Sequence, residues 1–206
     1  MKINNFLLSP CETTTDLSIA TKLRYKAYRH VNAIEENELK EFSDKYDLQN
    51  NTKTCLIYEG NEAVAAVRAC IYSKEYDYLP IPAFEVYKEE IAKEIGLDKT
   101  IIESNRYVVI PEKKDSKSLF KHPYKFIILN SLKFDSDFVI AAVREKHIPL
   151  YRRFLDMEPI SGLKKYPGIN VEMILMAVDC RKFRQGIMEK EEAYAISKEE
   201  IEYYSL

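Results

Sequence analysis

The chain has no tryptophan, few glycines and no long apolar segment. Its five glycines form neither a GxGxxG nor a GxxxxGK[ST] motif, so neither a dinucleotide-binding fold nor a P-loop is predicted. No segment approaches the roughly 20 apolar residues of a membrane-spanning helix, and the apolar run 6–8 is too short for a secretory signal. A net charge of -2 provides no overall basic field, so binding to nucleic acid or to an anionic membrane is not expected.

Cysteine is also scarce and carries no recognisable chemistry. The four cysteines form no CxxC pair and show no metal-ligand spacing with the three histidines. We therefore expect a reduced, cytoplasmic protein without a bound metal. A GxSxG motif and a paired His/Cys arrangement are absent too, which argues against a nucleophilic hydrolase.

What is present suits one globular domain. The chain has 206 residues, of which 46% are hydrophobic, and this is enough to bury a sizeable core. We expect the domain at residues 1–180, with an insertion at about 74–100 that could cap a pocket. A charged extension, 181–206, follows it and is expected to end in a helix.

The first elements are a helix and a hairpin. Capping residues at 13–16 and apolar residues at every fourth position of 19–31 predict a first helix, on which Arg24 and Tyr28 share a stripe. Residues 32–51 are acidic and predict a loop or a short exposed helix. Two apolar strands joined by Gly60 and Asn61 then predict a hairpin, whose second strand contains Arg68.

The rest of the chain alternates between strands and helices. The insertion carries an amphipathic helix that ends at Gly96. After it we expect a strand at 101–110, a helix at 122–134, a strand at 137–143, a helix from Pro149 and a strand at 170–178. This order predicts an α/β fold with a mixed central sheet flanked by helices.

Several charged residues interrupt segments that otherwise look buried. They are Arg24, Asp44, Asp47, Arg68, Glu103 and Arg106. Buried charges are costly unless they are paired, so we expect these side chains to form one polar network. Glu103 and Arg106 would face opposite sides of a regular strand, but a bulge near Ser104 or Asn105 would bring them to one face. The network is either a functional site or a purely stabilising ion-pair cluster.

Four short motifs together resemble a known group of enzymes. They are LRYKAY at 23–28, SDKYD at 43–47, AAVRA at 65–69 and ESNRYVV at 103–109. In order and approximate spacing they are similar to the acyl-homoserine lactone (autoinducer) synthases and their relatives, the N-acyl amino acid synthases. These families have the GNAT acyltransferase fold. The resemblance covers roughly residues 5–180 and implies a GNAT-like fold for this chain.

The sequence departs from the lactone synthases at one informative place. Ala33 and Ile34 stand where those enzymes usually carry a tryptophan, which argues against S-adenosylmethionine as the amine substrate. The motifs ESNRYVV and HIPLY resemble the N-acyl amino acid synthases more closely, and those enzymes acylate a free amino acid. The glycine-rich pyrophosphate loop of acetyl-CoA enzymes is also missing, since PEKKDSKS stands there. Acyl carrier protein is therefore at least as good a candidate donor as coenzyme A.

The resemblance implies direct transfer of a fatty acyl group from a phosphopantetheine thioester to the α-amine of an amino acid, without a tightly bound cofactor. Glu103 would be the general base, acting through a water, and Tyr151 would protonate the leaving thiolate. Arg24 is the first candidate for binding the substrate carboxylate. The remaining residues expected to bind the substrate or organise the site are Tyr28, Asp44, Asp47, Arg68 and Arg106.

The acyl donor is expected on the segment after Arg106. Backbone N–H groups around Tyr107, Val108 and Val109 would stabilise the thioester oxygen. The loop residues Lys113, Lys114 and Ser116 could contact the phosphopantetheine phosphate. Three alternatives stay open: a lactone synthase that uses S-adenosylmethionine, a generic acetyl-CoA-dependent GNAT enzyme, and a non-catalytic binding module. The amino acid, the acyl length and the oligomeric state do not follow from the sequence.

Overall fold

The computed structural model describes residues 2–3, 5–114, 116, 119, 121–182 and 199–200. The helices are α1 (Thr14–His30), α2 (Phe84–Glu94), α3 (Lys121–Lys133) and α4 (Ile148–Leu155), with short 3-10 helices η1 (Lys45–Leu48), η2 (Lys74–Tyr76), η3 (Pro111–Lys113) and η4 (Glu145–His147). The strands are β1 (Lys2–Ile3), β2 (Phe6–Pro10), β3 (Thr52–Glu59), β4 (Glu62–Tyr72), β5 (Ile101–Val109), β6 (Phe138–Val143), β7 (Glu158–Pro159), β8 (Lys164–Lys165) and β9 (Glu172–Asp179).

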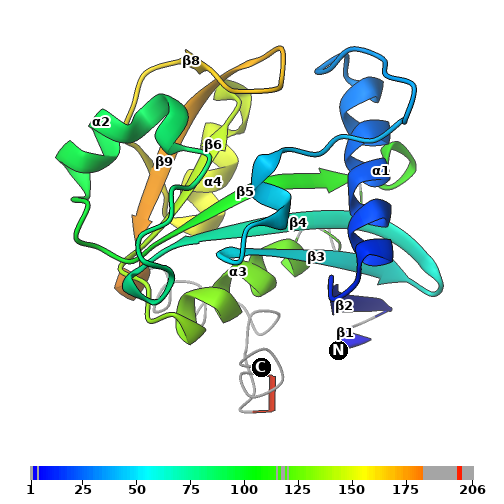
Figure 1. Cartoon of the computed structure of the whole chain (residues 1–206), viewed down its shortest axis with the longest axis horizontal. Coiled ribbons are helices and arrows are strands. Elements are labelled where there is room, and N and C mark those ends of the chain that lie inside the picture. Colours follow the sequence, from blue (N-terminus) through cyan, green and yellow to red (C-terminus); the bar gives the residue numbers. More distant parts are fainter. Residues whose placement is uncertain are drawn as a thin grey trace.

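These elements form a mixed sheet flanked by helices, which confirms the predicted α/β class (Figure 1). The strands follow the spatial order β1-β2-β3-β4-β5-β6-β9-β7, and β8 pairs with β9. The pairing of β5 with β6 is parallel, and the other strand pairs described are antiparallel. In Figure 1, helix α3 lies below the sheet and α2 above it, whereas α1 crosses the right-hand part of the sheet.

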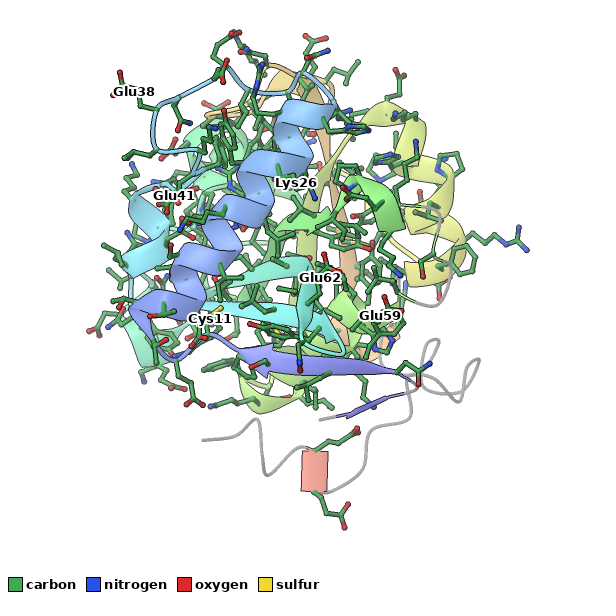
Figure 2. The ribbon with its side chains drawn as sticks, turned by 90° about the vertical axis from the view of Figure 1, so that its right-hand side faces the viewer. Cys11, Lys26, Glu38, Glu41, Glu59 and Glu62 are labelled. Atoms are coloured by element: carbon green, nitrogen blue, oxygen red, sulfur yellow. The ribbon has the colours of Figure 1, made fainter. Side chains whose placement is uncertain are left out.

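Helix α1 begins where the sequence predicts. The Thr13 hydroxyl accepts the backbone N–H of Asp16 at 3.1 Å, and the Asp16 carboxylate accepts the N–H of Thr13 at 3.0 Å. This reciprocal capping satisfies N–H groups that the first helical turn leaves unpaired. Figure 2 shows α1 crossing in front of the sheet, with the loop that carries Glu38 and Glu41 along one side of it.

The predicted hairpin is formed by β3 and β4. Gly60 supplies the positive φ of +61° that the turn requires, a conformation that glycine adopts at little cost. The residues of β4 from Val64 to Tyr72 are all buried, so Arg68 lies in the middle of a fully buried stretch.

The insertion contains η2 and the predicted helix, α2. Ile81, Ala83, Tyr87 and Ile91 are completely buried, and they pack with residues of β4, β5 and β9 in a second hydrophobic cluster. The insertion therefore covers the sheet next to β5 and shields that strand from solvent.

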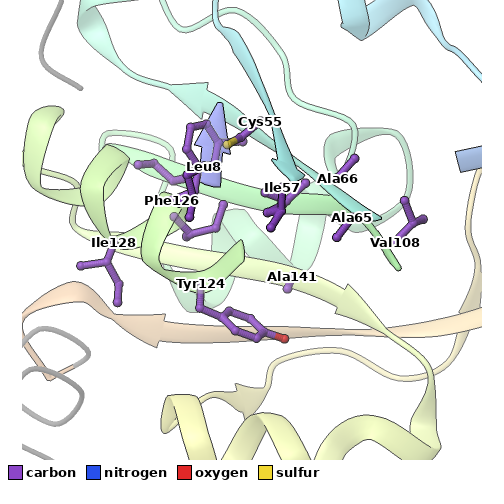
Figure 3. Close-up of a cluster of buried hydrophobic side chains, with 14 of the residues drawn as sticks. Leu8, Cys55, Ile57, Ala65, Ala66, Val108, Tyr124, Phe126, Ile128 and Ala141 are labelled. Carbon is purple, nitrogen blue, oxygen red and sulfur yellow. The ribbon is translucent and has the colours of Figure 1, made fainter. Parts of the chain in front are cut away.

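The larger hydrophobic cluster includes the contact between α3 and the sheet. Figure 3 shows Tyr124, Phe126 and Ile128 of α3 facing side chains of β2 to β6 such as Ile57 and Ala141. This packing holds α3 against the central strands, and two of these strands, β4 and β5, carry polar residues described below.

Within the described ranges, no helix is both long and apolar enough to cross a membrane. The predicted extension 181–206 lies almost entirely outside the described residues. The first two residues of the extension continue the structure from β9, and residues 199–200 are described near α3, where Glu200 pairs with Lys125 at 2.7 Å.

Candidate active site

Five of the six predicted charged residues form one continuous chain of ion pairs. Arg24 donates to Asp47 at 2.7 Å, and Asp47 also accepts Arg68 at 2.7 Å. Arg68 reaches Asp44 at 2.7 and 2.9 Å, and Asp44 in turn accepts Arg106 at 2.7 and 3.2 Å. The expected network therefore exists, and each carboxylate bridges two guanidinium groups, which offsets the cost of burying them.

The two aspartates reach this network because η1 turns them inward. Asp44 caps η1 by accepting the N–H of Tyr46 at 2.9 Å, and the Asp47 carboxylate accepts the N–H of Asp44 at 3.0 Å. The sequence predicts a loop or a short exposed helix for 32–51. The short helix is confirmed, but exposure is wrong for its centre, because Asp47 and Tyr46 are shielded by α1 and α2.

A β-bulge places Arg106 on the same face as Glu103. Ala66 pairs with Val108 and Arg68 pairs with Asn105, so Arg106 and Tyr107 together stand opposite Val67. The predicted bulge is thus present, at the two residues that follow Asn105. Arg106 has φ of +52°, a conformation that is sparsely populated for residues with a side chain. This backbone turn directs both Asn105 and Arg106 toward the arginine-aspartate network.

Glu103 lies beside the ion-pair chain without joining it. Its side chain is 0% exposed, and it accepts the N–H of Ala83 at 2.8 Å and the hydroxyl of Tyr166 at 2.6 Å. Burial raises the pKa of the Glu103 carboxyl above its ordinary value, although these hydrogen bonds and the nearby Arg68 act in the opposite direction. Such a carboxyl holds a proton more readily than an exposed glutamate does.

A cavity of about 410 Å³ opens where β5 and β6 separate. The two strands pair only from Ile101 to Glu103, opposite Phe138 to Ile140, and no described strand pairs with this edge of β5 beyond that point. Predicted site residues that line the cavity are Tyr28, Arg106, Tyr107, Val108, Val109, Lys114 and Tyr151. The backbone edge of β5 therefore faces the cavity, as oxyanion donors would have to.

Other predicted site residues lie behind the cavity wall. The side chain of Arg24 is 0% exposed, is bound to Asp47 and does not line the cavity, so it is not placed to bind a substrate carboxylate directly. Asp44, Asp47 and Arg68 are likewise absent from the lining. These residues support Arg106, which is 7% exposed and does line the cavity.

The cationic rim of the cavity differs from the prediction. Lys114 lines it, but Lys113 pairs with Glu59 at 2.6 Å and Ser116 is outside the lining. Arg144, Lys146 and His147, which follow β6, also line the cavity. The sequence could have indicated these three residues, because they directly follow a predicted strand. Residues at the carboxyl ends of neighbouring parallel strands meet at one edge of a sheet.

Two aromatic residues of the site had no signal in the sequence. The guanidinium of Arg106 lies 4.7 Å from the ring centre of Phe42 and 6.0 Å from that of Tyr166. Gly168 packs against the same group, since a Cβ there would stand 3.4 Å from Phe42 and 3.9 Å from the Arg106 guanidinium. Phe42 and Tyr166 come from irregular segments, in which no periodicity indicates the direction of a side chain.

The ion-pair chain predicts a specific dependence of stability on pH. Burial alone would raise the pKa of Asp44, but hydrogen bonds and charges from Arg68 and Arg106 hold it far below its ordinary value. A carboxyl with a lowered folded-state pKa stabilises the fold above its unfolded pKa of about 3.9, and this stabilisation is lost as the pH falls further. The difference in unfolding free energy between the wild type and Asp44→Asn should therefore be constant above about pH 5 and shrink below about pH 4.

Urea unfolding of both proteins between neutral and acidic pH measures this difference. Glu89→Gln, which replaces an exposed carboxylate on α2, is the control for general acid effects. The lowered pKa of Asp44 would be contradicted if the difference in unfolding free energy between the wild type and Asp44→Asn stayed constant down to the lowest pH at which both fold.

Among the described residues, no group of three or more His, Cys, Asp and Glu side chains could hold a metal ion. The site therefore consists of a buried carboxylate, an arginine-aspartate network and a cavity with tyrosines in its wall. These groups suit proton transfer and the binding of a polar substrate with an apolar portion.

Comparison with known proteins gives the family. Residues 19–179 match the model of the family described as N-acyl amino acid synthase FeeM. The structure of FeeM, an N-acyl amino acid synthase from uncultured soil microbes, superposes with a TM-score of 0.73 at 13% identity, covering 90% of this chain and 98% of that one. None of the curated proteins compared with the chain matches it significantly in sequence.

Lactone synthases share the fold. The acyl-homoserine lactone synthase LasI superposes with a TM-score of 0.65 at 16% identity, covering 89% of this chain and 95% of that one. The CoA-dependent lactone synthase BjaI gives 0.65 at 16% identity, with 90% and 89% covered. These likenesses confirm the predicted GNAT-like fold. Because the family model spans most of the chain, the protein belongs to the N-acyl amino acid synthase FeeM family and is an acyltransferase.

Proposed function

We propose that the protein transfers a fatty acyl group from a phosphopantetheine thioester to the α-amine of an amino acid. The observation that carries this proposal is the cavity at the separation of β5 and β6, with Arg106 in its wall and the buried Glu103 behind it. An α-amine is mostly protonated at neutral pH and must lose a proton before it attacks a carbonyl. Glu103 directly precedes Ser104, which lines the cavity, and burial raises the pKa of the Glu103 carboxyl.

The amino acid would be oriented by Arg106. Its Nε and Nη2 are bound to Asp44, which leaves Nη1 available to a substrate carboxylate. Asp44, Arg68, Asp47 and Arg24 then have a positioning role, because each holds the next member of the chain in place. We accordingly assign carboxylate binding to Arg106 in place of Arg24.

The thioester would lie along the open edge of β5. Backbone N–H groups at Tyr107 to Val109 supply hydrogen bonds to the carbonyl oxygen. Tyr151 lines the same cavity, and burial raises the pKa of its hydroxyl, so it holds the proton that the leaving thiolate needs. Lys114, Arg144 and Lys146 at the rim supply positive charge for the phosphate of phosphopantetheine.

The donor would be acyl carrier protein or acyl-coenzyme A, since both carry phosphopantetheine. The four cysteines are free thiols, which suits the reducing cytoplasm in which we expect the enzyme to act.

Mass spectrometry of organic extracts tests this function. A bacterial host that expresses the wild type should accumulate N-acyl amino acids, whose masses give the acyl length and the amino acid, and a host that expresses Glu103→Gln should not. Lactones in place of N-acyl amino acids would move the amine substrate to S-adenosylmethionine. An extract identical to that of the empty host, with folded protein present, would contradict the proposal.

A further inference from the structure

The proposed base cannot reach the substrate directly. Glu103 is 0% exposed and is absent from the residues that line the cavity. A general base must lie within hydrogen-bond distance of the proton it takes, or be connected to it through one intermediate group. The proposed function therefore requires a group that contacts Glu103 and also borders the cavity.

Tyr166 meets both conditions. Its hydroxyl donates to a carboxylate oxygen of Glu103 at 2.6 Å, and the residue lines the cavity. It comes from the segment between β8 and β9 and binds Oε1 of Glu103, whereas the N–H of Ala83 binds Oε2. The Tyr166 ring is 3% exposed and is fixed beside Arg106.

The neighbouring groups are less suited to this task. Asn105 also lines the cavity, but its amide oxygen accepts Arg68 at 2.7 Å, and a neutral amide neither gains nor loses a proton at ordinary pH. Arg68 stays protonated and has no acceptor. A phenol can donate one proton while it accepts another, so among the described contacts of Glu103 only Tyr166 can pass a proton onward.

The geometry points to Tyr166 as a proton relay between the substrate amine in the cavity and Glu103. This inference rests on the proposed function. One proton of the substrate ammonium passes to the Tyr166 oxygen while the phenolic proton passes to Glu103, and the freed amine nitrogen then forms its bond to the thioester carbon. The second proton that this nitrogen loses passes to solvent as the amide forms. The intermediate then breaks its C–S bond, and the thiolate leaves with the electron pair and takes a proton from Tyr151. Exchange with solvent restores Tyr151 and removes the proton from Glu103.

The electrostatic surroundings favour a concerted transfer. Burial, together with the charge of Glu103, raises the pKa of Tyr166 well above its ordinary value, so the phenol starts neutral and a lasting phenolate is disfavoured. Titratable or charged groups face Glu103 from several elements: Tyr46, Arg68, Cys70, Tyr87 and Tyr166.

Tyr166→Phe, Glu103→Gln and the double variant together test the relay. Tyr166→Phe keeps the ring and removes the hydroxyl, so kcat should fall about 10²-fold or more while the KM for the amino acid changes little. Because both residues belong to one relay, the double variant should be no slower than the slower single variant. Tyr72→Phe, which removes a hydroxyl that donates to the Leu97 carbonyl at 3.0 Å, is the matched control and should keep wild-type kcat.

Wild-type kcat in Tyr166→Phe, or effects that multiply in the double variant, would overturn the relay. A measurement that does not depend on turnover distinguishes failure of the relay from failure of the proposed function. The infrared carboxyl band that Glu103→Gln lacks reports the Glu103 pKa, which should rise in Tyr166→Phe because a hydrogen bond to the carboxylate is lost. An unchanged pKa contradicts the relay even if the wild type forms no N-acyl product.

Discussion

Replacement of Glu103 by glutamine is expected to lower kcat for N-acyl amino acid formation by about 10²–10⁴-fold, the usual contribution of a general base. Glutamine has nearly the same shape and can still accept the N–H of Ala83, but it cannot take a proton from the amine. The measurement is steady-state turnover of purified protein with an acyl thioester and an amino acid.

The pH profile adds a second part to this prediction. Because burial raises the pKa of Glu103, the acidic limb of kcat/KM for the wild type should lie above 4.5, the ordinary pKa of a glutamate. The residual activity of Glu103→Gln should lack this limb. Exposed Glu89 on α2 provides the control, and Glu89→Gln should behave as the wild type does.

Stability should not follow activity. A carboxyl whose folded-state pKa is raised favours the fold below its unfolded pKa, and this contribution is lost as the pH rises through the folded-state pKa. Above its folded-state pKa the ionised Glu103 is thus a cost to folding, and there Glu103→Gln should unfold at the same temperature as the wild type or higher. A large loss of stability with full specific activity would mean that the network only stabilises the fold.

Replacement of Asp47 by asparagine is expected to destabilise the fold by about 3–5 kcal/mol, the usual cost of removing one member of a buried ion pair. Asp47 bridges Arg24 and Arg68, whose side chains are both 0% exposed. Burial lowers the pKa of Arg24, and Asp47 is the carboxylate that offsets this burial. Without it, the one side-chain hydrogen bond left to Arg24 among the described residues is that to Thr54 at 3.4 Å.

Denaturant unfolding measures this loss, and a double variant tests its cause. Arg24→Met removes the charge that Asp47→Asn leaves unpaired, so the double variant should regain part of the lost stability. Glu112→Gln breaks the exposed pair with Lys26 and should change the unfolding free energy little. If the losses of unfolding free energy in Asp47→Asn and Arg24→Met simply add in the double variant, the unpaired charge of Arg24 does not cause the instability of Asp47→Asn.

Local rules were sufficient for most of the elements. Reciprocal capping by Thr13 and Asp16 sets the start of α1, and the Gly60 turn sets the β3-β4 hairpin, because both depend on neighbours in the sequence. The need to pair Arg68 within a buried strand likewise indicates, from the sequence alone, a network with Asp44 and Asp47.

Features that depend on distant segments were less completely predicted. The sequence indicates a bulge near Asn105, but its exact place at Arg106 is set by pairing with β4, which is more than thirty residues away. Arg24 was expected to bind the substrate carboxylate. It is not placed to do so, because its side chain pairs with Asp47 and does not line the cavity.

The sequence by itself determined the α/β class, the hairpin, the first helix and the identity of the charged residues, since these follow from periodicity, capping and the cost of burying charge. Only the tertiary structure decided which groups border the cavity. The separation of β5 from β6 creates that cavity, and the loop before β9 brings Tyr166 to Glu103 from 63 residues away. No local pattern encodes such a contact, because it is selected by packing across the sheet.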